Sequence, residues 1–179
     1  MPVYPIVFAP PALLGGYPNI QRRDATIWEG WLRTAPLGLV AVAYNVALGG
    51  QVPNDPDATE EMLRGWAYST AAKPDAVCDF GEVWWICEVK PSATLGAIGQ
   101  ALGYTLLAER EALTDKPMLP TIITDQAGPD LIWCCEQLDI NLVQLGTAVP
   151  TAASLPFPTG PVPGQEVTNN ETREPFTPS

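Results

Sequence analysis

The sequence predicts an α/β fold built on a mixed β-sheet. From residue 73 onward, a hairpin-like segment is followed by a helical stretch, a strand, a second helix and a last strand. This alternation of strand and helix patterns is typical of α/β domains. The chain has 179 residues, of which 46% are hydrophobic and only 16% charged, so it is long and apolar enough for one domain with its own core.

The part of the chain before the hairpin predicts an irregular arm and two helices. Residues 1–21 are rich in Pro and Gly, which favours an arm without regular structure. Residues 22–35 predict a helix that Asp24 caps. The apolar face of this helix would comprise Ile27, Trp31 and Leu32. Next come a β-prone run at 38–50, a loop at 51–61 and a short helix at 62–71.

Residues 73–90 predict a β-hairpin. A two-residue turn at Gly81-Glu82 would set Asp75 directly opposite Glu88, with their Cβ atoms ~5 Å apart. A three-residue turn would shift the register and separate the two carboxylates. Because side chains alternate along a strand, one face would be apolar throughout and the other polar only at its end. The apolar face would carry Val83, Trp85, Cys87 and Val89. The other face would carry Trp84, Ile86, Glu88 and Lys90.

Residues 93–113 predict the longest helix of the chain. Its apolar stripe would comprise Leu95, Ile98, Leu102, Leu106 and Leu113. Gln100 and Tyr104 are spaced i, i+4 and would lie roughly on the opposite side. Three glycines would allow this helix to approach a sheet closely, namely Gly96, Gly99 and Gly103. A strand at 119–125, a helix at 128–139 and a strand at 140–146 complete the pattern.

Composition narrows the possible chemistry. The chain has no histidine, which excludes Ser-His-Asp, Cys-His and His-metal sites. The four cysteines show no C-x-x-C spacing and are expected to be buried free thiols in a reducing compartment. The net charge of −11 argues against tight non-specific binding of nucleic acid. No apolar run reaches the ~18 residues of a membrane span, so we expect no membrane partner, no secretion, and a cytoplasmic or virion location.

The order of several short motifs resembles the PD-(D/E)xK nuclease superfamily, in its RecB-like branch. The motifs are Glu29 in a helix, Pro74-Asp75, Glu88-Val89-Lys90, and the Q-x-x-x-Y pair Gln100 and Tyr104. The resemblance covers roughly residues 22–146. It implies a restriction-endonuclease-like core of the order αβββαβ within a domain at 22–147.

This resemblance also implies roles for the motif residues. Asp75, Glu88 and the carbonyl oxygen of Val89 would hold Mg²⁺ or Mn²⁺, which would activate a water for DNA phosphodiester hydrolysis. Lys90 would orient or deprotonate that water and stabilise charge on the phosphate. Glu29 would assist through a water or a second metal, and Gln100 and Tyr104 would position the scissile strand.

Each of these residues also has a plainer interpretation. Glu88 and Lys90 could form a surface ion pair, and Glu29 could be a solvated helix residue. Gln100 and Tyr104 could serve packing or lie on the surface. Asp79 could be a spare ligand or a residue that flanks the hairpin turn. The tryptophans Trp84, Trp85 and Trp133 are expected in the core or an interface.

A second function of a different class also fits the sequence. Residues 148–179 form a Pro-rich tail that is expected to be disordered alone or ordered on a partner protein. The acidic charge and this tail suggest a catalytically silent nuclease-like fold in a bacteriophage particle, for example a head-tail connector, neck or tail component. Its protein partners would then bind the N-terminal arm and the tail.

Five basic residues precede the motif lysine: Arg22, Arg23, Arg33, Arg64 and Lys73. They could line a DNA-facing edge of the domain, or they could be scattered over its surface.

Overall fold

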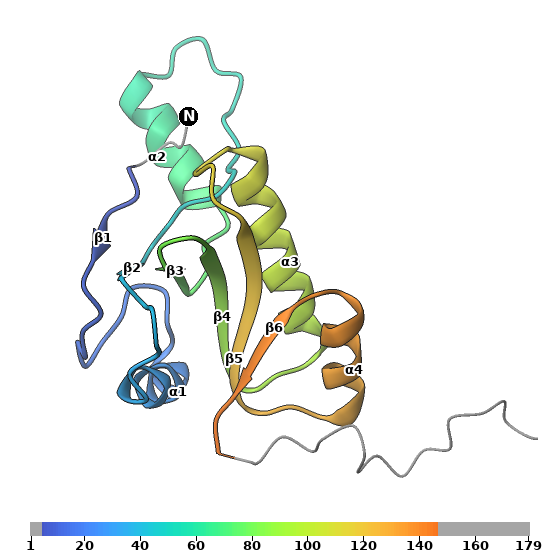
Figure 1. Cartoon of the computed structure of the whole chain (residues 1–179). Helices are drawn as coiled ribbons and strands as arrows, with labels where there is room; N and C mark the ends of the chain where they lie inside the picture. The colour runs from blue at the N-terminus through green and yellow to red at the C-terminus, as the bar shows by residue number, and fades with distance from the viewer. Residues whose placement is uncertain (1–4, 147–179) are drawn as a thin grey trace, which may run out of the picture. The chain divides into compact units, whose positions relative to one another are not determined.

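The computed structural model describes residues 5–146, which form a six-stranded mixed sheet with helices on both faces (Figure 1). The strands lie in the order β1-β2-β3-β4-β5-β6. Pairing is antiparallel from β1 to β4 and parallel from β4 to β6. The α/β class and the mixed sheet predicted from the sequence are therefore confirmed.

The elements follow the chain in a simple order. The strands are β1 (Phe8–Ala9), β2 (Ala41–Ala43), β3 (Ala76–Asp79), β4 (Trp84–Ser92), β5 (Met118–Gln126) and β6 (Asn141–Gln144). The helices are α1 (Arg22–Arg33), α2 (Glu60–Thr70), α3 (Leu95–Arg110) and α4 (Pro129–Gln137). Within residues 5–146, no helix has both the length and the apolar character that crossing a membrane requires.

The core lies in layers on the two faces of the sheet. On one face, Trp28 and Trp31 of α1 pack against Cys87, Val89 and Ile123. On the other face, α3 and α4 pack against β4, β5 and β6 (Figure 1). Strands β4 and β5 are therefore covered on both sides, which explains why their sequences are apolar rather than alternating.

The hairpin has the predicted register. Ala76 pairs with Cys87 and Cys78 pairs with Trp85, as a two-residue turn at Gly81-Glu82 requires. Gly81 has a φ of +84°, a backbone conformation that glycine adopts without strain. The N–H of Phe80 donates to the carbonyl of Val83 at 3.0 Å and closes the turn. Because Ala76 pairs with Cys87, the chain just before Ala76 lies beside Glu88.

Helix α1 departs from the prediction at its N-terminus. The helix begins at Arg22 and its N-cap is Gln21, so the expectation that Asp24 caps it is wrong. Asp24 lies in the first turn and is only 1% exposed. With Trp28 and Trp31 it forms an i, i+4, i+7 stripe that faces the sheet, while Ile27 and Leu32 are only partly buried.

Helix α3 buries only part of the predicted stripe: Ile98 is in the core and Leu102 packs against it. Leu95 and Leu106 of the expected leucine stripe are each 63% exposed. The buried residues are mostly small: Ala97, Ile98, Ala101, Thr105 and Ala108. Small side chains let the helix approach the sheet closely. The glycines do not serve this purpose, because an added Cβ at Gly99 or Gly103 would meet no atom within 4 Å.

Two regions before the hairpin differ from the prediction, the N-terminal arm and the β-prone run at 38–50. The arm, expected to be irregular, contributes β1, which pairs with β2. The β-prone run at 38–50 forms only the three residues of β2 and a single bridge between Leu48 and Ala72. The Pro-rich tail predicted at 148–179 lies outside the described residues.

The four cysteines have free thiols, as predicted. Cys78, Cys87 and Cys135 are buried, and Cys134 is partly exposed. The Sγ atoms of Cys78 and Cys87 are 3.8 Å apart, a contact distance rather than a bond. Of the predicted core tryptophans, Trp84 is buried, whereas Trp133 is 59% exposed.

Candidate metal centre

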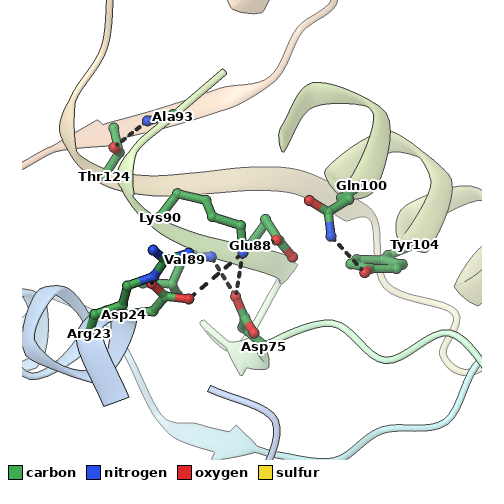
Figure 2. Close-up of polar contacts among 10 residues, drawn as sticks. All are labelled: Arg23, Asp24, Asp75, Glu88, Val89, Lys90, Ala93, Gln100, Tyr104 and Thr124. Carbon is green, nitrogen blue, oxygen red and sulfur yellow. Dashed lines mark hydrogen bonds and ion pairs between the residues drawn. The ribbon is translucent and has the colours of Figure 1, made fainter. Parts of the chain in front are cut away.

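Four charged side chains converge beside the second half of β4 (Figure 2). Asp24 comes from α1, Asp75 directly precedes β3, and Glu88 and Lys90 project from β4. The exposed fractions of the three acids are 1% for Asp24, 7% for Asp75 and 2% for Glu88. Buried acids are rare unless they are paired or bind a metal. The sequence-predicted Asp75, Glu88 and Lys90 thus come together, and Asp24 joins them.

The ammonium of Lys90 lies among the three carboxylates. Its Nζ is 2.5 Å from Oε1 of Glu88 and 3.9 Å from Oδ2 of both Asp24 and Asp75. The contact with Glu88 is a short ion pair, so the buried Oε1 of Glu88 is matched by the ammonium of Lys90. Oδ1 of Asp24 is also buried; it accepts no hydrogen bond, and its charged neighbour is Nε of Arg23 at 3.5 Å. Cations rather than hydrogen-bond donors of the backbone therefore lie beside these two oxygens.

The charges at this centre do not balance. Three carboxylates face the ammonium of Lys90 and the exposed guanidinium of Arg23, so negative charge remains in excess when the cluster is fully ionised. Buried charge without compensation destabilises a fold by several kcal/mol. A divalent cation would offset this excess of negative charge, and carboxylate oxygens are the ligands that Mg²⁺ and Mn²⁺ prefer. The donor set and its charge both fit such an ion.

Asp75 is fixed by the backbone of β4. Its N–H donates to the carbonyl of Cys87 at 3.1 Å, and its Oδ2 accepts the N–H of Val89 at 2.8 Å. The N–H and C=O of one strand residue point to the same side of the strand. The carbonyl of Val89 is therefore directed toward the side of β4 on which Asp75 lies, where the predicted ligand set needs it.

The pKa values reflect burial among like charges. Burial, and then the charge of Glu88, raise the pKa of Asp75 to about 7, although the Val89 N–H and Lys90 oppose this shift. Burial also raises the pKa of Glu88, against the effect of Lys90. Burial lowers the pKa of Lys90, but the three carboxylates outweigh it and the net shift is upward. Lys90 therefore stays protonated when no cation is bound.

Gln100 and Tyr104 of α3 flank the cluster on the side away from α1 (Figure 2). Nε2 of Gln100 donates to the hydroxyl of Tyr104 at 3.2 Å, so the predicted i, i+4 pair is formed. Burial raises the pKa of Tyr104, and the charges of Glu88 and Asp75 act in the same direction against the hydrogen bond from Gln100.

Glu29 is not brought to the cluster by any contact in the described part of the chain. Its Oε1 accepts the hydroxyl of Tyr17 at 3.3 Å, and its Oε2 is 3.7 Å from Arg33. A residue five positions along a helix is rotated by ~140°, so Glu29 and Asp24 lie on different faces of α1. Asp24 is thus the acid of α1 that reaches the cluster. The signal for it was its i, i+4, i+7 spacing with Trp28 and Trp31.

The remaining sequence candidates divide between the centre and other sites. Arg23 lies beside the centre, with Nε 3.5 Å from Oδ1 of Asp24. Lys73 precedes Pro74-Asp75 but donates to the carbonyl of Tyr68 at 2.8 Å. Asp79 accepts the N–H of Gly81 at 2.8 Å and pairs with Lys116 at 2.9 Å, so it flanks the turn and lies at the opposite end of the hairpin.

Within residues 5–146, no three Asp, Glu, Cys or His side chains are grouped to hold a metal by themselves. The predicted ligand set contains only two such side chains, Asp75 and Glu88, with a backbone carbonyl as the third ligand. Comparison of the chain with protein families, with curated proteins and with solved structures finds no match. The argument for function therefore starts from the geometry of this centre.

Proposed function

We propose that the protein is a metal-dependent nuclease that hydrolyses DNA phosphodiester bonds. The observation that supports this most directly is the buried cluster of Asp24, Asp75 and Glu88 around Lys90, in which the carboxylates outnumber the cations, Lys90 and the exposed Arg23. A cluster that serves only stability would pair each buried charge. The restriction-endonuclease-like character of the fold is part of the same proposal.

Asp75, Glu88 and the Val89 carbonyl would hold Mg²⁺ or Mn²⁺. The ion would supply Lewis-acid activation of a bound water and of the phosphate. Asp75, whose pKa is about 7 in the metal-free protein, would give up its remaining proton when the cation binds.

The residues of the chain would then divide the remaining work. Lys90, whose side chain is 28% exposed, would turn from Glu88 to the phosphate and stabilise the charge that develops on it. Asp24 would hold the ammonium in place, which makes it a positioning residue. Gln100 and Tyr104 would donate hydrogen bonds to the bound strand from the side of α3.

The proposal is tested by incubating plasmid and linear DNA with the protein and either Mg²⁺ or Mn²⁺. We expect cleavage by the wild type and a loss of about 10²–10³-fold in Glu88→Ala and Lys90→Ala. Glu29→Gln is the matched control, because it removes an acid of α1 that lies outside the cluster. Failure of the wild type to cut with either metal, over a range of salt concentrations, would refute the proposal.

A structural role in a bacteriophage particle is the second candidate function. The observations in its favour are the net charge of −11 and large exposed apolar side chains, among them Trp66, Leu106 and Trp133. In this case the fold would contribute surfaces rather than turnover. Assembly of normal, infectious particles without the protein would exclude this role.

A further inference from the structure

A pocket of about 340 Å³ lies at the sheet edge that carries Asp75 and serves none of the roles assigned above. Its walls come from three parts of the chain, namely Pro5–Val7 of the arm, Tyr44–Ala47 after β2, and Tyr68 of α2. The volume is in the range of pockets that bind small organic groups. The walls are largely apolar and aromatic, with Asn45 as the side-chain amide.

The pocket and the metal centre share one edge of the sheet. The last pair between β2 and β3 is Ala43 with Val77, and the same register brings Asn45 to the level of Asp75. The loop after β2 is also tied to the segment that leads into Asp75. Leu48 and Ala72 exchange two backbone hydrogen bonds, of 2.8 Å and 3.0 Å. A nucleic-acid strand that follows this end of the strands would pass both sites.

The amide of Asn45 is held in a fixed orientation. Its Nδ2 donates to the hydroxyl of Tyr68, and its Oδ1 accepts Nδ2 of Asn19 at 2.9 Å. A primary amide has two donor and two acceptor positions, so one of each remains for a ligand. The φ of Asn45 is +59°, a left-handed conformation that asparagine tolerates better than most residues and that is often found at functional sites.

A cation lies next to the pocket on the side of the chain that leads to Asp75. Nζ of Lys73 is 4.2 Å from the centroid of the Tyr68 ring and donates to the Tyr68 carbonyl at 2.8 Å. These contacts fix the ring that forms one wall of the pocket. They also place a positive charge beside this wall of the pocket.

We propose that this pocket binds one nucleobase of the substrate strand while a neighbouring phosphate lies at the metal centre. A planar, uncharged ligand with both a donor and an acceptor on its edge matches aromatic walls and an oriented amide, and nucleobases have these properties. The inference rests on the proposed nuclease function and extends it. It predicts that the enzyme reads one base at a defined position relative to the bond it cuts.

The test is an abasic scan of a short single-stranded DNA. Binding is measured by fluorescence anisotropy with Ca²⁺ in place of Mg²⁺, and a gel confirms that the strand stays intact. We expect that loss of the base at one position weakens binding about tenfold, whereas loss at the others has a small effect. In Asn45→Gly and Tyr68→Ala, the intact strand should bind about tenfold more weakly, and the penalty at that position should disappear.

Further variants separate base recognition from damage to the fold. Asn45→Asp keeps the shape and the tolerated φ but replaces the amide donor with an acceptor, so it should lose the positional penalty as well. Trp66→Ala is the matched control, because Trp66 is an aromatic residue of α2 that is 55% exposed and lies outside the pocket. It should bind the intact strand like the wild type and keep the penalty.

A metal-free measurement distinguishes failure of this inference from failure of the nuclease proposal. In two-dimensional NMR spectra, millimolar nucleoside monophosphates should shift the side-chain amide signals of Asn45, and ribose 5-phosphate should not. Equal shifts with ribose 5-phosphate, or abasic penalties that are the same at every position, would overturn base binding even if the protein cleaves DNA. Base-dependent shifts in a protein that never cleaves DNA would support the pocket and refute the nuclease proposal alone.

Discussion

The two ends of the β3–β4 hairpin carry the same types of residue in opposite electrostatic states. At the turn, Asp79 is matched by Lys116 and by the N–H of Gly81. At the other end, Asp75 shares a single ammonium with two further buried carboxylates. Burial acts to raise the pKa of Asp79, but the hydrogen bonds from Lys116 and Gly81 outweigh it and the net shift is downward. The pKa of Asp75 is instead raised to about 7.

This difference indicates which end serves stability and which serves function. A carboxylate with a lowered pKa stabilises the fold, whereas one with a raised pKa destabilises it whenever it is ionised. Proteins retain such destabilising groups mainly at sites with a function. The contrast between the two ends of one hairpin is therefore evidence for a site, independent of any motif.

The largest effect is expected for Lys90→Met. Removing the ammonium leaves three buried carboxylates with the exposed Arg23 as their remaining cation, so the metal-free protein should lose about 3–5 kcal/mol of unfolding free energy at pH 8. Urea unfolding in EDTA measures this loss. Lys116→Met is the matched control at the turn and should cost at most about 1 kcal/mol, since its Asp79 partner remains partly solvated. Equal losses in the two variants would contradict the comparison.

A bound divalent cation should compensate most of the excess negative charge at the metal centre of the wild type. If Mn²⁺ binds only the folded protein, a concentration of one hundred times its Kd adds about 2.7 kcal/mol of stability. Thermal unfolding with and without Mn²⁺ measures the effect. Glu88→Gln should abolish it, whereas Asp79→Asn should leave it intact. An unchanged melting temperature in the wild type at millimolar Mn²⁺ would show that the centre does not hold the ion.

Asp75→Asn should stabilise the metal-free protein. The folded pKa of Asp75 is about 7, above its ordinary value of 3.8, so the folded state holds the proton more tightly. Its contribution to stability is therefore fully present below about pH 4 and is lost as the pH rises toward 7 and above. At pH 8 the substitution should add about 1–3 kcal/mol, and the gain should vanish near pH 4. Denaturant titrations at both values test the sign, and a loss at pH 8 would contradict it.

The sequence was sufficient for the hairpin register but not for the acid of α1. Two-residue turns fix the pairing of the residues that follow, so Gly81-Glu82 sets the register from Asp79–Trp84 to Ala76–Cys87 without tertiary information. Asp75 lies just beyond this ladder, where its N–H donates to the carbonyl of Cys87. Asp24 could not be assigned in the same way, because aspartate suits both a cap and a first turn, and helix starts shift by one or two residues. Only the packing of Trp28 and Trp31 on the sheet shows which way Asp24 faces.

The buried face of α3 was ambiguous for a related reason. Its leucines and its alanines both recur with helical spacing, so periodicity alone allows either face to pack. The structure selects the small face with Ala97, Ala101 and Ala108, because the sheet and helix lie close together. The choice matters for the site, since it sets Gln100 and Tyr104 beside the cluster instead of away from it.

The smallest effect is expected at the turn. Asp79→Asn removes an ion pair that is partly exposed but keeps an acceptor for the N–H of Gly81, so it should cost about 0.5–1 kcal/mol at pH 7. Because the folded pKa of Asp79 is lowered, its contribution is present above the ordinary value of 3.8 and is lost as the pH falls through the folded pKa. The difference between wild type and variant should therefore shrink in acid, the reverse of the pH dependence at Asp75. If Asp75→Asn and Asp79→Asn gave the same pH dependence of stability, the pKa values of the two carboxyl groups would not be shifted in opposite directions. The comparison would then give no support for a functional site at the Asp75 end of the hairpin.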